Sequence, residues 1–438
     1  MTVLMLELNE VNFDHVREYI KLGRLPHLAK LLTSHALIET TSEKEYEQLE
    51  PWIQWVTAHT GLPLAEHGVF RLGDIVDRDI PQIWEVLEAR GLKVGAISPM
   101  NAKNRCENAA FFMPDPWTPT DVTGSALMKH LNDAVSQAVN DNAKGRVTFR
   151  SALWLIAGLT AYARPANYPV YLKTLSSIVR RRSWASSLLL DQLLADLFVR
   201  EVKRKKPNFA SLFLNAAAHI QHHYMFNAEV YSGPFSNPAW YVDAASDPVL
   251  DVYQLYDRVV GQVRTLFPDA RLMLATGLHQ DPHKDLTFYW RLKNHANFLE
   301  QANIRFDRVE PRMSRDFIIY CSDPNAAALA ERGLKQIRSI DGAELFEIDN
   351  RGNSLFVMLT WPHDITTDFE YFVGNEPKRN FRDQVAFVAI KNGAHNGIGY
   401  LIDTGEGAQD TPRTIPLASL PQRISQACGV SWQSTATS

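Results

Sequence analysis

Apolar runs of strand length alternate along this chain with segments of helical periodicity. The run 2–8 (TVLMLEL) precedes a helical pattern over 13–32, and the helical pattern 252–267 precedes the run 270–276 (ARLMLAT). Strand–helix–strand alternation is typical of a mostly parallel sheet whose two faces are covered by helices. In such sheets, ligands bind beyond the carboxyl ends of the strands. We therefore expect an α/β fold with its functional site at that edge.

The composition fits a globular enzyme or binding protein and excludes several other classes. The 438 residues are 45% hydrophobic and 21% charged, enough for one large α/β domain or two smaller ones. The net charge of 45 − 49 = −4 gives no overall basic field, so we expect no nucleic-acid partner. Cys106, Cys321 and Cys428 are widely spaced, which argues against a disulfide framework and against a thiolate zinc site.

No segment has the features of a targeting signal or a bilayer span. The N-terminal residues lack a basic region, and the apolar stretch 152–163 (ALWLIAGLTAYA) is too short to cross a membrane. We therefore expect a cytoplasmic protein with no membrane span. Two basic runs, Arg180–Arg182 and Lys203–Lys206, are typical of solvated helix ends, and a membrane-surface or anionic-substrate role is the less favoured alternative.

Two stretches interrupt the alternation within a single domain, 1–438. Residues 107–205 are helical and end in an amphipathic helix with leucines at 189, 193 and 197, so we expect a helical cap insert. Residues 286–375 combine strands, a helix and a hairpin with Asn350–Asn353 at its turn, so we expect a small α+β lobe.

A histidine cluster follows the apolar run 209–215. His219, His222 and His223 lie within five positions, and on a helix the spacings of three and four residues bring such side chains onto neighbouring faces. Imidazole nitrogens suit zinc and other borderline transition metals better than magnesium. A hydrogen-bonded cluster without metal is the alternative.

Several stretches together resemble the alkaline phosphatase superfamily, in its type I phosphodiesterase/nucleotide pyrophosphatase branch. The resemblance lies in their order along nearly the whole chain apart from the two inserts: 23–32 (GRLPHLAKLL), 50–68 (EPWIQWVTAHTGLPLAEHG), 212–225 (LFLNAAAHIQHHYM), 272–280 (LMLATGLHQ) and 393–405 (GAHNGIGYLIDTG). It implies an alkaline-phosphatase-like three-layer sandwich, two divalent metals and a Thr or Ser nucleophile acting on a phosphate ester.

The chain departs from the family pattern at three positions. The metal-binding Asp of the first strand falls on Asn9, and the nucleophile falls on Pro51, which has no hydroxyl. The Asp-His pair of the second metal falls on Gly277–Leu278. We expect this second site to be dismantled, which leaves Glu50 and Asn9 as the catalytic candidates. Glu50 could ligate a metal, act as a base or simply cap the helix that begins at Pro51.

The first metal site of the family is better preserved. His222 and His395 match two of its ligands, while its Asp falls on Ala218, next to His219. The resemblance therefore implies a site made of His219, His222 and His395, which would hold zinc, or manganese as the alternative.

Other candidates carry a structural alternative. Arg71 is a candidate for binding an anionic substrate, or it pairs with Asp74. Trp55 is a candidate for a substrate wall, with core packing or stacking on His59 as the alternative. Thr57 and Thr60 carry hydroxyls but lie one to two helical turns beyond the nucleophile position, so neither is favoured as a replacement nucleophile.

Two functions remain open from the sequence. The first is a divergent metal-dependent hydrolase or transferase, with a single metal as one option, acting on a small-molecule or glycan phosphate ester, a phosphodiester or a sulfate ester. The second is a non-hydrolytic relative, a binding or accessory protein with no metal. The sequence leaves the oligomeric state open.

Overall fold

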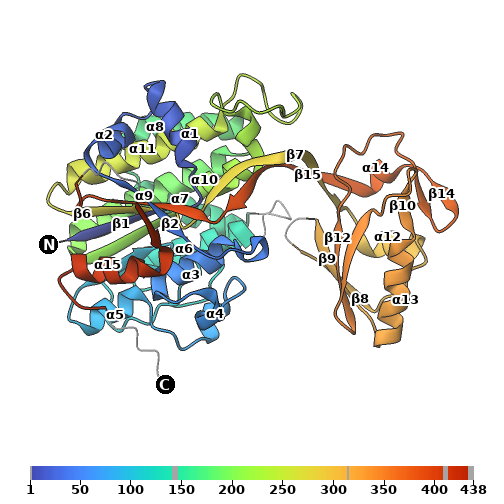
Figure 1. Ribbon diagram of the computed structural model, residues 1–438, viewed down its shortest axis with the longest axis horizontal. Coiled ribbons are helices and arrows are strands. Elements are labelled where there is room, and N and C mark those ends of the chain that lie inside the picture. Colours follow the sequence, from blue (N-terminus) through green and yellow to red (C-terminus); the bar gives the residue numbers. More distant parts are fainter. Residues whose placement is uncertain (1, 141–146, 313–314, 408–412, 433–438) are drawn as a thin grey trace. The chain divides into compact units, whose positions relative to one another are not determined.

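The computed structural model describes residues 2–140, 147–312, 315–407 and 413–432. The chain divides into two units (Figure 1). A main unit contains residues 1–282 and 393–438, and a second unit contains residues 283–392.

An eight-stranded sheet forms the centre of the main unit. Its order is β17-β2-β16-β6-β1-β5-β3-β4, and β16 alone of the eight runs antiparallel to its neighbours. The bounds are β17 Arg413–Pro416, β2 Leu37–Thr41, β16 Ile398–Asp403, β6 Arg271–Ala275, β1 Val3–Leu8, β5 Phe209–Leu214, β3 Val94–Ile97 and β4 Phe111–Met113. The mostly parallel central sheet expected from the sequence is confirmed.

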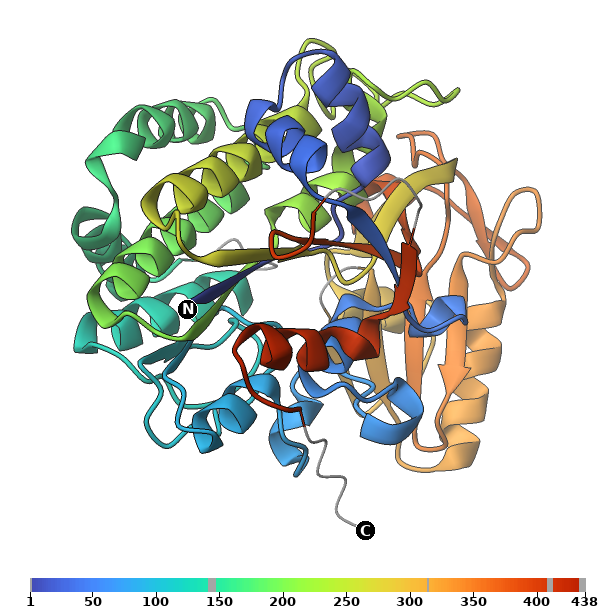
Figure 2. The ribbon, with the colours of Figure 1, turned by 60° about the vertical axis from the view of Figure 1, so that its left-hand side comes forward.

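Side-chain alternation along β1 divides the core into two layers. Every residue of β1 and β5 is buried, as expected of central parallel strands. Leu4 and Leu6 face one hydrophobic cluster, whereas Val3 and Met5 face the other. Helices cover both faces, which gives the expected three-layer sandwich (Figure 2).

The helices divide between these faces. On the Leu4 and Leu6 side lie α1 Phe13–Lys21, α2 Pro26–Ser34, α6 Ala126–Asn140, α7 Phe149–Tyr162, α9 Ala185–Lys205, α10 Ala216–Tyr224 and α11 Pro248–Leu266. On the Val3 and Met5 side lie α3 Pro51–Thr60, α5 Ile83–Ala89 and α15 Leu420–Ala427. The short α4 Leu64–His67 follows α3, and α8 Tyr168–Val179 packs against α9.

The stretch 107–205, expected as a cap insert, is integrated into the main unit. It contains α6 to α9, but it also contributes β4, which extends the edge of the main sheet. The inner residues of α9, among them Leu194, Leu197 and Phe198, belong to the main core. This stretch is therefore helical without forming a unit of its own among the residues that the structure describes.

The second unit is small and mixed. One sheet has the order β11-β12-β9-β8 and another the order β10-β13-β14, and three helices accompany them. The bounds are α12 His295–Gln301, β8 Arg308–Pro311, β9 Asp316–Tyr320, α13 Pro324–Lys335, β10 Ile337–Ser339, β11 Phe346–Asn350, β12 Ser354–Leu359, β13 Tyr371–Val373, β14 Glu376–Lys378 and α14 Phe381–Gln384.

The expected lobe 286–375 and this unit, 283–392, share most of their residues. The antiparallel hairpin β11–β12 forms as expected, and Gly352 at its turn has a φ of +86°. The unit extends further because the long strands β7 His279–Leu292 and β15 Val385–Asn396 pair with each other as the chain leaves and re-enters the main unit. Throughout the described residues, no helix combines the length and the apolar character needed to cross a bilayer.

Candidate metal centre

Three ligating side chains meet at the carboxyl edge of the central sheet. Glu10 follows β1, His222 lies in α10 directly after β5, and His395 lies near the end of β15, shortly before β16 begins. Because β16 runs antiparallel to its neighbour β6, its start lies at the edge where the parallel strands end. Segments far apart in the sequence thus meet where α/β sheets bind their ligands.

The three ligand atoms of this triad (Glu10, His222 and His395) lie close together. The two Nε2 atoms of His222 and His395 are 3.1 Å apart, and Glu10 Oε2 lies 3.2 Å from His395 Nε2 and 3.4 Å from His222 Nε2. Donors around a tetrahedral zinc at about 2.0–2.1 Å lie about 3.3–3.4 Å from one another. The triad therefore has the donor types and the separations of a site with two histidines and one carboxylate.

Exposure differs across the triad. The Glu10 side chain is 2% exposed and that of His395 is 12% exposed, whereas His222 is 32% exposed. Catalytic zinc sites keep one coordination position open for water or substrate, while structural sites are closed. The exposed flank of His222 gives this triad an approach from solvent.

The backbone at Glu10 is held in an unusual conformation. Its φ is +61°, in the left-handed region that few non-glycine residues adopt. The Glu10 N–H donates to Thr276 O (3.1 Å), and the Glu10 carbonyl accepts from Gln221 Nε2 (2.7 Å). These bonds to neighbouring segments fix the turn that sends the carboxylate toward the two histidines.

The Glu10 carboxylate is oriented by two amides. Asn9 Nδ2 donates to Oε1 (3.2 Å), and Gln280 Nε2 donates to Oε2. Burial acts to raise the pKa of Glu10, but the nearby His395 and His222 imidazoles outweigh it and hold that pKa well below its usual range. Glu10 therefore presents an ionised carboxylate to the site, as a metal ligand must be.

Gly393 permits the close approach of the His395 segment. A Cβ at this position would lie 1.9 Å from Gln280 Oε1 and 3.0 Å from the Gln221 carbonyl oxygen. Gln280 and Gln221 both donate hydrogen bonds to Glu10. The glycine at 393 therefore lets the segment that carries His395 pack directly against the two residues that hold Glu10.

Glu50 lies at the rim of the triad. It is the N-cap residue of α3, before Pro51 at the first helical position, and its Oε2 is 3.9 Å from His395 Nδ1. Its side chain is 33% exposed, so solvent reaches this carboxylate. The structure thus brings Glu50, His222 and His395 together among the residues expected from the sequence.

His219 does not join them. Its exposed ring packs against that of His223, one helical turn later, with 4.9 Å between the ring centroids. The expected ligand set therefore needs a correction, since Glu10 and not His219 is the third member of the group. Glu10, in the left-handed conformation after β1, directs its carboxylate toward His222 and His395. Helix α10 contributes His222 alone to this group, because the His219 ring packs against His223.

Asn9 and Trp55 are buried beside the triad and bond to each other. Trp55 Nε1 donates to Asn9 Oδ1 (2.7 Å), and Asn9 Nδ2 also donates to Asn215 Oδ1 (2.8 Å). Trp55 is fully buried in the core, so it differs from the substrate wall considered above, and its ring lies 5.7 Å from that of His59. The Asn9 side-chain amide therefore donates to Glu10, while its oxygen accepts the hydrogen bond of the Trp55 indole.

The sequence resemblance places the Asp-His pair of a second metal at Gly277–Leu278, and neither of these residues can bind a metal through its side chain. Gly277 packs so closely that a Cβ there would lie 3.0 Å from the Trp55 ring, and Leu278 is fully buried. His279, one residue later, donates through Nδ1 to the Ile398 carbonyl (2.5 Å) and contacts Asp281 through Nε2 (3.1 Å). Across the described residues, the triad is the one group of three or more His, Cys, Asp or Glu with metal-ligand spacing.

The hydroxyls of α3 are engaged elsewhere. Thr57 Oγ1 lies 3.2 Å from His67 Nε2, and Thr60 Oγ1 donates to the Val56 carbonyl (2.7 Å). Both threonines are buried. Arg71, the expected anion-binding residue, is exposed, and its backbone N–H donates to Asp74 Oδ2 (3.1 Å).

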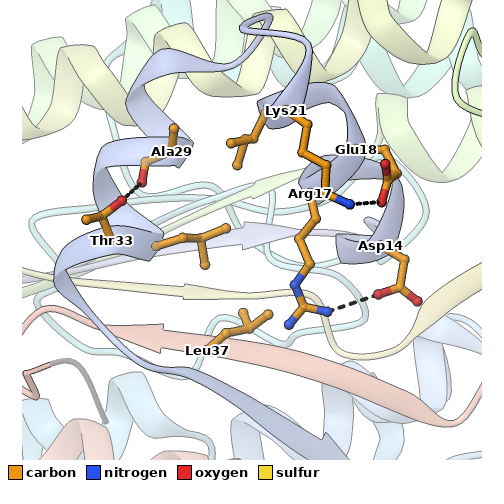
Figure 3. A pocket seen from close by; sticks show the side chains of 9 residues that line it. Asp14, Arg17, Glu18, Lys21, Ala29, Thr33 and Leu37 are labelled. Atoms are coloured by element: carbon orange, nitrogen blue, oxygen red, sulfur yellow. Dashed lines mark hydrogen bonds and ion pairs between the residues drawn. The ribbon is translucent and has the colours of Figure 1, made fainter. Parts of the chain in front are cut away.

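A separate pocket lies between α1, α2 and the start of β2 (Figure 3). Its charged lining is internally paired, with Arg17 on Asp14 (3.0 Å) and Lys21 on Glu18 (2.6 Å). Two cations and two anions cancel there, so this pocket offers no positive field to a phosphate. The triad remains the site with a chemical rationale.

Sequence reasoning missed Glu10 as a ligand, although Glu10 directly follows the expected metal position at Asn9. It also missed Gln221 and Gln280, which hold Glu10. One signal was available, namely an acidic residue at the end of a buried first strand. The positive φ that aims it was not readable from the sequence.

Comparisons with known proteins give similarity in fold only. No family model matches the chain, and no curated protein matches it in sequence. Among solved structures it is similar to phosphonoacetate hydrolase from Sinorhizobium meliloti 1021 in complex with phosphonoacetate, at 11% identity over 98% of this chain and 96% of the other, with a TM-score of 0.42.

Two further solved structures are similar over the same shares, 98% of this chain and 96% of the other. They are murine ectonucleotide pyrophosphatase/phosphodiesterase 5, at 7% identity and a TM-score of 0.41, and the alkaline phosphatase PafA, at 10% identity and a TM-score of 0.46. Identities this low leave the chemistry of the chain to be argued from its own residues.

Proposed function

We propose that this chain is a metal-dependent hydrolase of phosphate-bearing esters that uses one divalent cation, zinc or else manganese, held by Glu10, His222 and His395. The observation that carries the proposal is the convergence of three ligand atoms, separated by 3.1–3.4 Å, at the carboxyl edge of the sheet. Two imidazoles and one carboxylate form a ligand set that catalytic zinc sites use.

A divalent cation held there would supply an electrophile for a substrate oxygen and would lower the pKa of a water molecule. The protein's part is to hold the ligands and leave the approach past His222 open. Asn9 and Gln280 fix the Glu10 carboxylate, which contributes one negative charge against the two charges of the cation. The cation and its three ligands would therefore keep a charge of about +1, which suits a phosphate or sulfate oxygen, while the Glu50 carboxylate lies outside this ligand set at the rim.

Water is the nucleophile in this proposal. The family nucleophile position is Pro51, and the nearby hydroxyls of Thr57 and Thr60 are buried and bonded within the core. Glu50 is solvent-accessible and lies 3.9 Å from His395 Nδ1, at the rim of the triad. We infer that Glu50 accepts the proton of the attacking water.

A binding protein without turnover is the second candidate. It is favoured by the filled second site, where Gly277 packs against the Trp55 ring and Leu278 is fully buried in place of metal ligands. Under this alternative the chain keeps the fold and its cleft but has lost the chemistry.

Metal content measured together with turnover separates the two. Purified protein would be loaded with zinc or manganese, analysed for bound metal, and assayed on aryl phosphate monoesters, aryl phosphate diesters and an aryl sulfate. We expect one cation per chain and turnover that His222→Ala abolishes. His219→Ala is the matched control, since this exposed histidine on the same helix should leave both readings unchanged.

Stoichiometric metal without turnover would favour the binding protein. Equal loss of metal in His219→Ala and His222→Ala would contradict the ligand set. Absence of bound metal in the wild type would remove the basis of the hydrolase proposal altogether.

A further inference from the structure

Exposed apolar side chains concentrate on helices α7 and α8. Of the fourteen large hydrophobic residues found exposed among the described residues, eight fall within positions 147–179. They are Val147, Phe149, Leu153, Ile156, Tyr168, Leu172, Leu175 and Val179. Single exposed apolar residues are ordinary, but such a concentration in so short a stretch indicates an interaction surface.

The spacing of these residues places them on one face of each helix. Tyr168, Leu172, Leu175 and Val179 follow one another at intervals of four, three and four along α8, the periodicity of a helical stripe. Leu172 is 68% exposed and Val179 is 83% exposed. Phe149, Leu153 and Ile156 repeat the pattern on α7. We call these two rows the outer stripes.

The opposite faces of both helices are anchored to the main unit. On α8, the buried Tyr171 donates to Asp196 of α9 (2.9 Å). On α7, the buried Gly158 lies against Leu131 of α6. Both helices, teal and green at the left of Figure 2, lie at the outside of the helix layer. The outer stripes therefore point away from the core.

The charge of this segment is wholly positive. Residues 147–190 contain six Lys and Arg and no Asp or Glu, which gives +6 in a chain whose net charge is −4. The rest of the chain therefore carries −4 − 6 = −10. Arg180 and Arg181 are exposed and directly follow Val179, the most exposed residue of the α8 stripe. The exposed arginines thus lie at the end of the apolar stripe of α8.

Exposed apolar side chains next to exposed arginines favour a lipid surface as the partner over a second copy of this chain. A second copy packed stripe to stripe would bring the exposed Arg180 and Arg181 of both copies together, and like charges in an interface are unfavourable. Amphipathic helices that lie in the membrane interface combine an apolar face with flanking Lys and Arg that contact anionic lipid headgroups.

We propose that the outer stripes of α7 and α8, together with Arg180 and Arg181, dock the main unit reversibly onto a membrane surface rich in anionic lipid. The apolar side chains enter the boundary between headgroups and acyl chains, while the arginines remain at the headgroups. The protein thereby binds to the membrane without spanning it.

Vesicle co-sedimentation tests this with the full chain. Vesicles of phosphatidylcholine alone would be compared with vesicles that also contain phosphatidylserine, at low and high NaCl. We expect binding to the phosphatidylserine vesicles only, weakening as salt rises. Arg180→Gln with Arg181→Gln should lower the partition coefficient by roughly tenfold or more. Leu172→Ser with Val179→Ser should lower it to a similar extent.

Matched controls come from exposed residues elsewhere. Leu329→Ser with Ile340→Ser and Lys44→Gln with Arg305→Gln remove equivalent groups from other surfaces, so both pairs should bind as the wild type does. Circular dichroism melting confirms that each variant folds, which the exposure of these side chains favours.

Three outcomes would overturn the proposal. One is the absence of wild-type binding to either kind of vesicle. Another is binding that the stripe and arginine variants leave unchanged. The third is a concentration-dependent dimer, or a complex with an acidic protein, that the stripe variants abolish while vesicle binding stays absent.

Discussion

The two halves of the sheet's carboxyl edge differ in chemistry although they lie side by side. In one half, Glu10, His222 and His395 converge with their ligand atoms 3.1–3.4 Å apart. In the other half, Trp55 packs against Gly277, and its indole bonds to the side-chain oxygen of Asn9. The edge thus has the polar triad in one half and a packed apolar group in the other. We call this apolar group, made of Trp55, Gly277 and Leu278, the plug.

The difference teaches that the scaffold and the chemistry vary independently. The parallel strands bring both sets of positions to the same edge, and the side chains there decide what each half does. A fully buried tryptophan and leucine need no ligand to be stable, whereas a buried carboxylate needs partners. We therefore expect the plug to act on stability and the triad to act on metal binding.

Glu10→Gln should give the largest effect. It removes the one anionic ligand, and we expect metal affinity to fall by roughly a hundredfold or more and turnover to be lost. Isothermal titration calorimetry with zinc and the aryl phosphate assay measure both. Glu47→Gln, at an exposed glutamate, is the control. Retained affinity in Glu10→Gln would break the assignment of this half.

Glu50→Gln should separate chemistry from binding. If Glu50 accepts the proton of water, we expect kcat to fall by about a hundredfold while bound metal remains stoichiometric. Steady-state kinetics and metal analysis on the same preparation provide the test, again beside Glu47→Gln. A parallel loss of metal would make Glu50 a residue that positions His395 instead.

Trp55→Phe should affect the plug alone. The change leaves Asn9 Oδ1 buried without its indole donor, so we expect a loss of about 1–3 kcal/mol in the free energy of unfolding. Urea denaturation measures the loss, and zinc affinity should stay within a few-fold of the wild type. A fall in affinity as large as that of Glu10→Gln would show that the two halves are not separable.

The smallest effect concerns acid stability near α3 and α4. Burial, with a contribution from Arg78, lowers the pKa of His67 to about 4, and its Nδ1 accepts a hydrogen bond from Val69 N–H (3.0 Å). The unfolded chain takes up this proton at a higher pH than the folded one, so stability is present above about pH 6.5 and declines as the pH falls toward 4.

His67→Gln should reduce this dependence by about 1–2 kcal/mol across that range. Urea denaturation at several pH values between 4 and 7 measures the slope. His363→Gln, at an exposed histidine, should leave it unchanged. An identical slope in His67→Gln and the wild type would contradict the role of His67.

The sequence carried most of the fold but only part of the site. Period and alternation are local, so they predicted the strands β1 and β6, the helix α11 and the hairpin β11–β12. The pairing of His222 with His395 followed from the order of the family motifs. The third ligand did not, because the aim of Glu10 depends on a φ of +61° and on bonds from Gln221 and Gln280.

The integration of 107–205 was equally out of reach. The leucines of α9 predicted an amphipathic helix, but periodicity does not say which surface covers its apolar face. Here that surface is the main core, and β4 pairs with β3 in the central sheet.

A crystal structure of the metal-loaded protein, with anomalous diffraction at the zinc edge, tests the central claim most directly. We predict one anomalous peak per chain within about 2.0–2.2 Å of Glu10 Oε2, His222 Nε2 and His395 Nε2. A second peak beside Asn9 and Gly277, a peak at His219 and His223, or a vacant triad in zinc-saturated crystals would contradict it.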